Sequence, residues 1–89
     1  PEETQGLSSE QQERMFLIFS MLIALFERAY LMLYKPKLNA IQKRRWASWE
    51  DYMREWCKRK DFANLLEELL NGEDPEFSRY ILRIKESNK

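Results

Sequence analysis

The sequence predicts an all-α fold, a compact bundle of four helices, and three observations lead to it. Apolar residues recur at spacings of three and four along most of the chain, the period of a helix. The composition is 44% hydrophobic and 13% aromatic, and good helix formers dominate it. Two glycines and three prolines leave little turn chemistry for a sheet of many strands. At 89 residues we expect one domain over 9–84, with a flexible segment at 1–8 and a polar tail at 85–89.

The first predicted helix spans about residues 10–34. A serine cap is available at Ser8 or Ser9, each followed three residues later by a glutamine, which completes a capping box. Pro36 disfavours a helical conformation at Lys35 and so ends the helix. Because this helix is apolar almost all round, we expect it to be largely buried at the centre of the bundle.

The second predicted helix spans about residues 39–59, with Asn39 as its cap. Its apolar positions fall at helical spacings after an early irregularity, so a break near residue 47 stays open. We favour one helix, bent or straight. The apolar positions are Ile41, Trp46, Trp49, Tyr52, Met53 and Trp56.

Two shorter amphipathic helices follow. Asp61 is the expected cap of the third helix, 62–71, which ends where Gly72 permits a left-handed conformation. The fourth helix, 75–84, begins after an aspartate cap with Pro75 at its first helical position. Both helices carry a regular apolar stripe and therefore need a surface to cover them.

The apolar stretch at residues 16–34 allows three interpretations: the core of the domain, a core shared with a dimer interface, or a membrane span. Its apolar side chains favour insertion by roughly 3–6 kcal/mol, whereas Glu27 and Arg28 near the bilayer centre cost about 5–7 kcal/mol. The balance opposes insertion. We favour a core helix, then a core helix with a dimer interface, and a membrane span last.

The chemistry-bearing residues do not form a catalytic pattern. The chain has no histidine, and so it lacks the commonest general base and metal ligand. Its single cysteine, Cys57, has no partner base and is expected to be a small buried hydrophobe, although Lys58 and Arg59 beside it favour the thiolate. We therefore expect no enzymatic activity, metal, cofactor or small-molecule substrate.

The charge of the chain is balanced overall but concentrated in its middle. Residues 35–60 hold nine bases and three acids, interleaved with tryptophans, a composition typical of surfaces that bind nucleic acid or anionic lipid. Arg54 follows Asp51 and Glu50 by three and four residues, and Arg59 follows Glu55 by four. Part of the positive charge is therefore matched locally, so a solvated face is favoured and nucleic acid is an unlikely partner. The candidate interaction patch is Lys43, Arg44, Lys58 and Lys60.

The tryptophans of the second helix are predicted to be structural. Trp46, Trp49 and Trp56 lie at helical spacing, which is more typical of a core than of a stacking platform. Arg45 and Arg59 fall on the same side, and we expect them to cover the core with their alkyl stems or to pair with a buried acid such as Glu27.

Several of these residues together resemble an uncharacterised bacterial helical domain, a domain of unknown function that follows N-terminal transmembrane segments. The resemblance implies the cytoplasmic domain of a membrane-tethered protein, cut from its anchor, which fits a chain that begins with Pro1. It also implies that Glu27 locks the first helix to an arginine or indole N–H of the second, and that Arg28 reaches the wet edge. It carries no catalytic residue. The matching motifs are ERAYLMLY (27–34), Trp46-x-x-Trp49-x-x-Tyr52, Trp56-x-x-Arg59-x-x-Phe62 and Phe77-x-x-Tyr80-Ile81.

The function expected from the sequence is that of a non-catalytic interaction or regulatory domain at the cytoplasmic face of a bacterial membrane. Its partner is expected to be another protein or a second copy of the chain. The alternative is a basic-aromatic surface, residues 43–60, that contacts anionic membrane lipid or nucleic acid.

Overall fold

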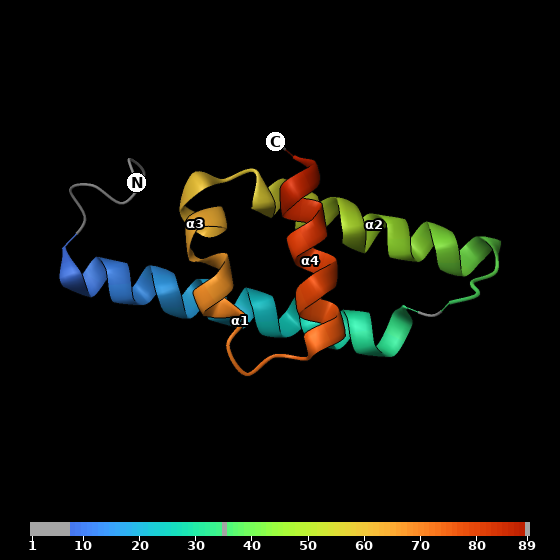
Figure 1. The fold of residues 1–89 in the computed structure, drawn as a ribbon, viewed down its shortest axis with the longest axis horizontal. Helices are drawn as coiled ribbons and strands as arrows, with labels where there is room; N and C mark the ends of the chain where they lie inside the picture. The colour runs from blue at the N-terminus through green and yellow to red at the C-terminus, as the bar shows by residue number, and fades with distance from the viewer. Residues whose placement is uncertain (1–7, 35, 89) are drawn as a thin grey trace.

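The computed structural model describes residues 8–34 and 36–88, which form four α-helices and no strand (Figure 1). This confirms the predicted all-α bundle of four helices. The helices are α1 (Ser9–Leu33), α2 (Ala40–Cys57), α3 (Lys60–Leu69) and α4 (Pro75–Ser87).

The helices form a long antiparallel pair that is crossed by two shorter helices. Figure 1 shows α1 and α2 running in opposite directions, with α3 and α4 lying across them, and each of the two shorter helices contacts both members of the pair. The N-terminal end of α1 extends beyond α3 (Figure 1). All three later helices therefore contact α1, and together they leave a long part of its surface uncovered.

The predicted caps of α1 and α2 are present in the structure. The Ser8 hydroxyl accepts a hydrogen bond from the Gln11 backbone N–H at 3.1 Å, and the Gln11 side chain accepts one from the Ser8 backbone N–H. Asn39 and Gln42 form the same reciprocal pair. α2 then continues without interruption through residue 47, so the preferred single helix is confirmed.

The predicted start of α3 is wrong by two residues. The helix begins at Lys60 with Arg59 as its cap, and Asp61 lies inside the first turn, where it is buried. The Asp61 carboxylate is occupied by the Arg59 guanidinium, at 2.7 and 3.0 Å, and by the Phe62 backbone N–H. A favourable capping residue is used here for an ion pair instead.

α4 begins as predicted and ends later than predicted. The Asp74 carboxylate accepts a hydrogen bond from the Phe77 backbone N–H at 3.0 Å, with proline at the first helical position. The helix continues to Ser87, so residues 85–87 are helical and are not a polar tail. The end of this segment is bonded to α2, since the Arg54 guanidinium donates a hydrogen bond to the Ser87 hydroxyl at 2.6 Å.

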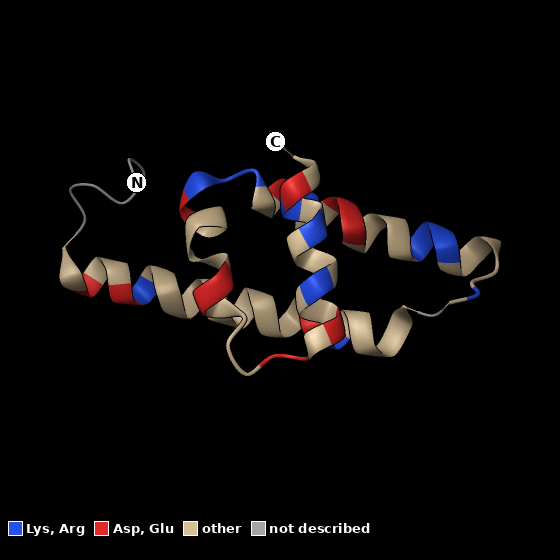
Figure 2. Cartoon of the chain, in the orientation of Figure 1, with Lys and Arg blue, Asp and Glu red and all other residues tan. Residues whose placement is uncertain are grey.

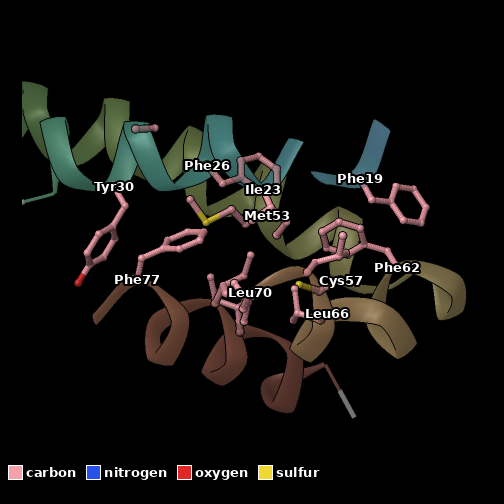
Figure 3. Packing of buried hydrophobic residues seen from close by; sticks show 14 of the residues in the cluster. Phe19, Ile23, Phe26, Tyr30, Met53, Cys57, Phe62, Leu66, Leu70 and Phe77 are labelled. Atoms are coloured by element: carbon pink, nitrogen blue, oxygen red, sulfur yellow. The ribbon is translucent and has the colours of Figure 1, made fainter. Parts of the chain in front are cut away.

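The core lies between the pair formed by α1 and α2 and the two shorter helices (Figure 3). Every helix contributes at least one side chain that is fully buried, among them Phe26 of α1, Met53 of α2, Phe62 of α3 and Phe77 of α4. Edge-to-face ring contacts link α1 to its neighbours, for example Phe19 to Phe62 at 5.2 Å between centroids.

The expectation that α1 is largely buried is wrong. Only 28% of its most apolar 18-residue stretch is buried. The cause is geometric, because three amphipathic helices cover one side of a long apolar helix and do not surround it. The buried residues of α1 are Phe19, Ile23, Phe26, Ala29 and Tyr30.

Candidate functional site

The candidate site is an exposed apolar face on α1, on the side away from the core. Its side chains are between 47% and 71% exposed. Single exposed hydrophobic residues are ordinary, whereas a contiguous group marks an interaction surface. We call this group the apolar face; it consists of Leu17, Ile18, Met21, Leu25, Leu31 and Met32.

The members of the apolar face share one side of α1 because of their spacing. Leu17 and Leu31 lie fourteen residues apart with Ala24 midway between them, and a spacing of seven returns to nearly the same side of a helix. Ile18, Leu25 and Met32 form a second row of the same period. This seven-residue recurrence of apolar residues is the feature of the sequence from which the apolar face could have been predicted.

Arg28 lies within the apolar face. It lines a shallow hollow together with Met21, Ala24 and Leu25. Arg28 is exposed, and it makes no hydrogen bond or ion pair within residues 8–34 and 36–88. The expectation that Arg28 reaches the solvent agrees with its exposure in the structure, and the side chains around it on this side of α1 are apolar. Figure 2 shows further charged residues near the N-terminal end of α1.

The apolar face is large enough to support a complex. Covering six partly exposed side chains of this size stabilises a complex by roughly 5–10 kcal/mol, and a partner with a similar face contributes about as much again. Association itself costs on the order of 4–15 kcal/mol. The two magnitudes are comparable, so the face fits a reversible contact better than a permanent one.

Glu27 joins α1 to the loop between α3 and α4, and not to α2 as the sequence analysis expected. Its carboxylate accepts a hydrogen bond from the Asp74 backbone N–H at 2.6 Å. The Glu73 carboxyl also contacts Glu27, and its pKa is raised by burial first and by the Glu27 carboxylate second. Sequence reasoning missed this contact because the two segments are 47 residues apart.

The tryptophans of α2 face the other helices. Trp46 is buried, and its indole N–H donates a hydrogen bond to the Tyr80 hydroxyl at 2.8 Å. The Tyr80 hydroxyl in turn donates to the Glu50 carboxylate. Trp49 and Trp56 are partly buried and pack against the core. None of the three is arranged as an open platform for bases.

The two arginines near the tryptophans have different surroundings. The guanidinium of Arg59 lies 5.3 Å from the centre of the Trp56 ring and 5.8 Å from that of Phe19, while it pairs with Asp61. That hydrogen bond holds the pKa of Asp61 below its ordinary value. Arg45 is exposed.

The structure separates the four members of the candidate basic patch. Lys43 and Arg44 lie near the start of α2, and Lys58 and Lys60 lie at the junction with α3, about 22 Å away along the helix. Figure 2 shows these as two blue regions with acidic residues between them. Lys58 is also paired with Glu55 at 2.8 Å.

Cys57 is buried in the core, as expected from the sequence. Burial raises the pKa of its thiol to about 11, an effect that outweighs the Lys85 and Arg54 charges nearby. The proposed thiolate-promoting effect of Lys58 and Arg59 is therefore not what sets this pKa. Within the ranges that the structure describes, no cluster of three or more potential metal ligands occurs.

No protein family, curated protein or solved structure matches this sequence. α1 is long and apolar enough to cross a membrane, with a mean hydropathy of 1.9 over its most apolar 18 residues. The same helix provides one side of the folded core, so its length and composition alone do not decide between the two roles.

Proposed function

We propose that this chain is a non-catalytic helical interaction module that acts through the apolar face of α1. The observation that carries the proposal is the exposure of six large apolar side chains on one side of one helix. A partner that covers them removes the unfavourable contact between apolar surface and water.

The difference between the buried side and the exposed side of α1 supports this proposal. The opposite side already supplies fully buried residues such as Ile23 and Phe26 to the core. The apolar face contributes nothing comparable to folding, and its side chains are more hydrophobic than a solvated surface needs. A contact with something other than the chain's own core accounts for their exposure.

The proposed location is the cytoplasmic face of a bacterial membrane. Its support is the resemblance of the aromatic motifs to the domain that follows transmembrane segments, together with an apolar helix that is suited to a membrane environment. In this arrangement the module brings membrane-tethered partners together.

The experiment compares the chain with a variant that carries Met21→Glu and Leu25→Glu. Both positions are exposed, so the fold is expected to survive, which circular dichroism and thermal unfolding verify. Sedimentation equilibrium without detergent measures self-association. Flotation with vesicles of three parts phosphatidylcholine and one part phosphatidylglycerol measures lipid binding.

The matched control is Ile41→Glu, which places a charge on an exposed apolar side chain of α2 outside the apolar face. We expect the parent chain to associate with itself or with vesicles, the double variant to lose that association, and the control to keep it. A parent chain that stays monomeric at all concentrations and does not float with vesicles would overturn the proposal.

A further inference from the structure

We propose that the occupant of the apolar face is a second copy of this chain, packed antiparallel through α1, with Arg28 of each copy facing Glu10 and Glu13 of the other. This inference rests on the proposed function and names its partner. Three features of α1 lead to it: its unpaired cation, its acidic first turns and its uncovered N-terminal end.

The first feature is the position of Arg28 in the middle of an apolar face. The described residues three and four positions from it are all apolar, and its neighbour Glu27 points to the loop between α3 and α4. Its hydrogen-bond donors have no partner among residues 8–34 and 36–88. A partner that covers the face with apolar groups alone leaves this charge buried and unpaired, which is costly. The partner must therefore present an acid at this point.

The second feature is that α1 itself carries such acids. Glu10 lies seven residues before Leu17 and so shares its side of the helix. Glu13 is exposed and makes no hydrogen bond or ion pair within the described part of the chain. The side chain of Glu10 is 74% exposed and forms an ion pair with Arg14, which is 71% exposed.

The relative direction of the two helices follows from these charges. A parallel pair in register places Arg28 against Arg28 and Glu10 against Glu10, which are like charges in contact. An antiparallel pair places the acidic first turns of one copy against Arg28 of the other. The register that aligns Arg28 with Glu10 also aligns Leu17 with Met21 of the second copy, so apolar residues meet at the centre. In this register α1 of the second copy covers residues 9–29, which include Leu17, Met21 and Leu25, and leaves the last turn of α1 outside the contact.

The third feature is the uncovered N-terminal end of α1. Residues 9–14 are all exposed, and the first buried residue of the helix is Phe19. This end extends past α3 in Figure 1. In the antiparallel pair it lies across residues 24–29 of the second copy, which gives the projecting turns of both copies a surface.

The experiment exchanges charges between the two ends of α1. Arg28→Glu and the double variant Glu10→Lys, Glu13→Lys each place like charges in contact in an antiparallel homodimer. We expect each to weaken self-association at least tenfold in sedimentation equilibrium at low salt. In an equimolar mixture every pair is complementary again, so a heterodimer of near-parental affinity is expected. Arg44→Glu, an exposed charge change on α2, is the control and leaves association unchanged.

Direction is tested separately by disulfide formation in a Cys57→Ala background. In the antiparallel pair the two copies of residue 31 are roughly 36 Å apart, so Leu31→Cys stays unlinked. A mixture of Leu17→Cys and Met21→Cys chains is expected to form a mixed disulfide. Efficient linkage through residue 31 would instead show a parallel pair and overturn the inference.

The outcomes separate this inference from the proposed function. A dimer that is lost in the Met21→Glu, Leu25→Glu variant but unaffected by Arg28→Glu retains the apolar face as the contact and overturns the charge-paired antiparallel geometry. A monomeric chain that floats with vesicles retains the proposed function and overturns the second copy as occupant. A monomeric chain that does not float overturns both.

Discussion

At the scale of single residues, the carboxyl of Glu73 is an unfavourable element of the fold. One of its oxygens is buried with no hydrogen-bond partner in the described part of the chain. The other side of the contact is Glu27, a second carboxylate, which is already engaged by the Asp74 backbone N–H. Burial and the neighbouring charge both raise the pKa of Glu73, so its ionised form is disfavoured in the folded state.

Glu73→Gln is therefore expected to stabilise the protein at neutral pH by about 1 kcal/mol, because a neutral amide removes the repulsion and can donate to Glu27. A raised folded pKa means that the stability associated with Glu73 is greatest below its ordinary value of 4.5 and is lost as the pH rises through the folded value. Urea unfolding between pH 4 and 8 measures both effects.

The control for this prediction is Glu67→Gln, an exposed glutamate of α3 for which no change beyond about 0.5 kcal/mol is expected. If Glu73→Gln lowered the stability at pH 7, or left its pH dependence unchanged, the unfavourable contact with Glu27 would be refuted.

The carboxylate of Asp61, unlike that of Glu73, is stabilised in its ionised form by the fold. It is 2% exposed and bonded twice to Arg59, so Asp61→Asn is expected to destabilise the protein by about 2 kcal/mol. The pKa of Asp61 is lowered, so its contribution is present above its ordinary value of 3.8 and is lost as the pH falls through the folded value. Guanidinium unfolding at pH 7 and pH 3 tests this.

The difference in unfolding free energy between the parent and Asp61→Asn is expected to shrink at pH 3. The control is Glu10→Gln, which breaks a solvent-exposed ion pair with Arg14 and is expected to change the unfolding free energy by less than about 1 kcal/mol. An equal loss in both variants would mean that burial of Asp61 has no energetic consequence.

At the scale of elements, α2 and α4 are joined by a chain of polar contacts through Trp46, Tyr80 and Glu50. Burial and the bond to Glu50 raise the pKa of Tyr80, which keeps its hydroxyl protonated and able to donate. Tyr80→Phe leaves the buried Trp46 N–H without its acceptor, so we expect a loss of about 1–3 kcal/mol in chemical unfolding.

The control for the α2–α4 contact is Tyr52→Phe. Tyr52 is 49% exposed and its hydroxyl makes no hydrogen bond to a described residue, so its removal is expected to be nearly neutral. Equal stabilities of the Tyr80→Phe variant and the parent would show that the polar contacts are incidental to the packing of the rings.

The elements themselves were largely predictable because their ends are set by local chemistry. The caps at Ser8, Asn39 and Asp74 involve residues three positions apart, which a sequence displays directly. The prediction that Asp61 caps α3 was wrong because its carboxylate instead bonds the Arg59 guanidinium, and that contact depends on the position of the Arg59 side chain. Glu27 was misassigned because its partner is brought near only by the folded loop between α3 and α4.

At the scale of the whole molecule, the main discrepancy concerns how much of α1 the bundle covers. A helix that is apolar along its length is predicted to be buried. The apolar pattern does not show which other helices, or which other molecule, cover it. The three later helices have one narrow stripe each, and together they cover one side of α1. The sequence therefore predicts that the remaining side, with Leu17, Met21 and Leu25 on it, belongs to the core, although none of the later helices α2, α3 and α4 covers it.

This arrangement makes a prediction about hydrogen exchange. The N-terminal turns of α1, residues 9–14, are exposed and project beyond the other helices, so their amides are expected to exchange rapidly in dilute protein. Association through the apolar face covers these turns. Their protection is therefore expected to increase with protein concentration, while that of the core residues Phe26 and Met53 stays constant. Hydrogen–deuterium exchange at two concentrations a hundredfold apart measures this, and protection of residues 9–14 that is independent of concentration would exclude the antiparallel pair.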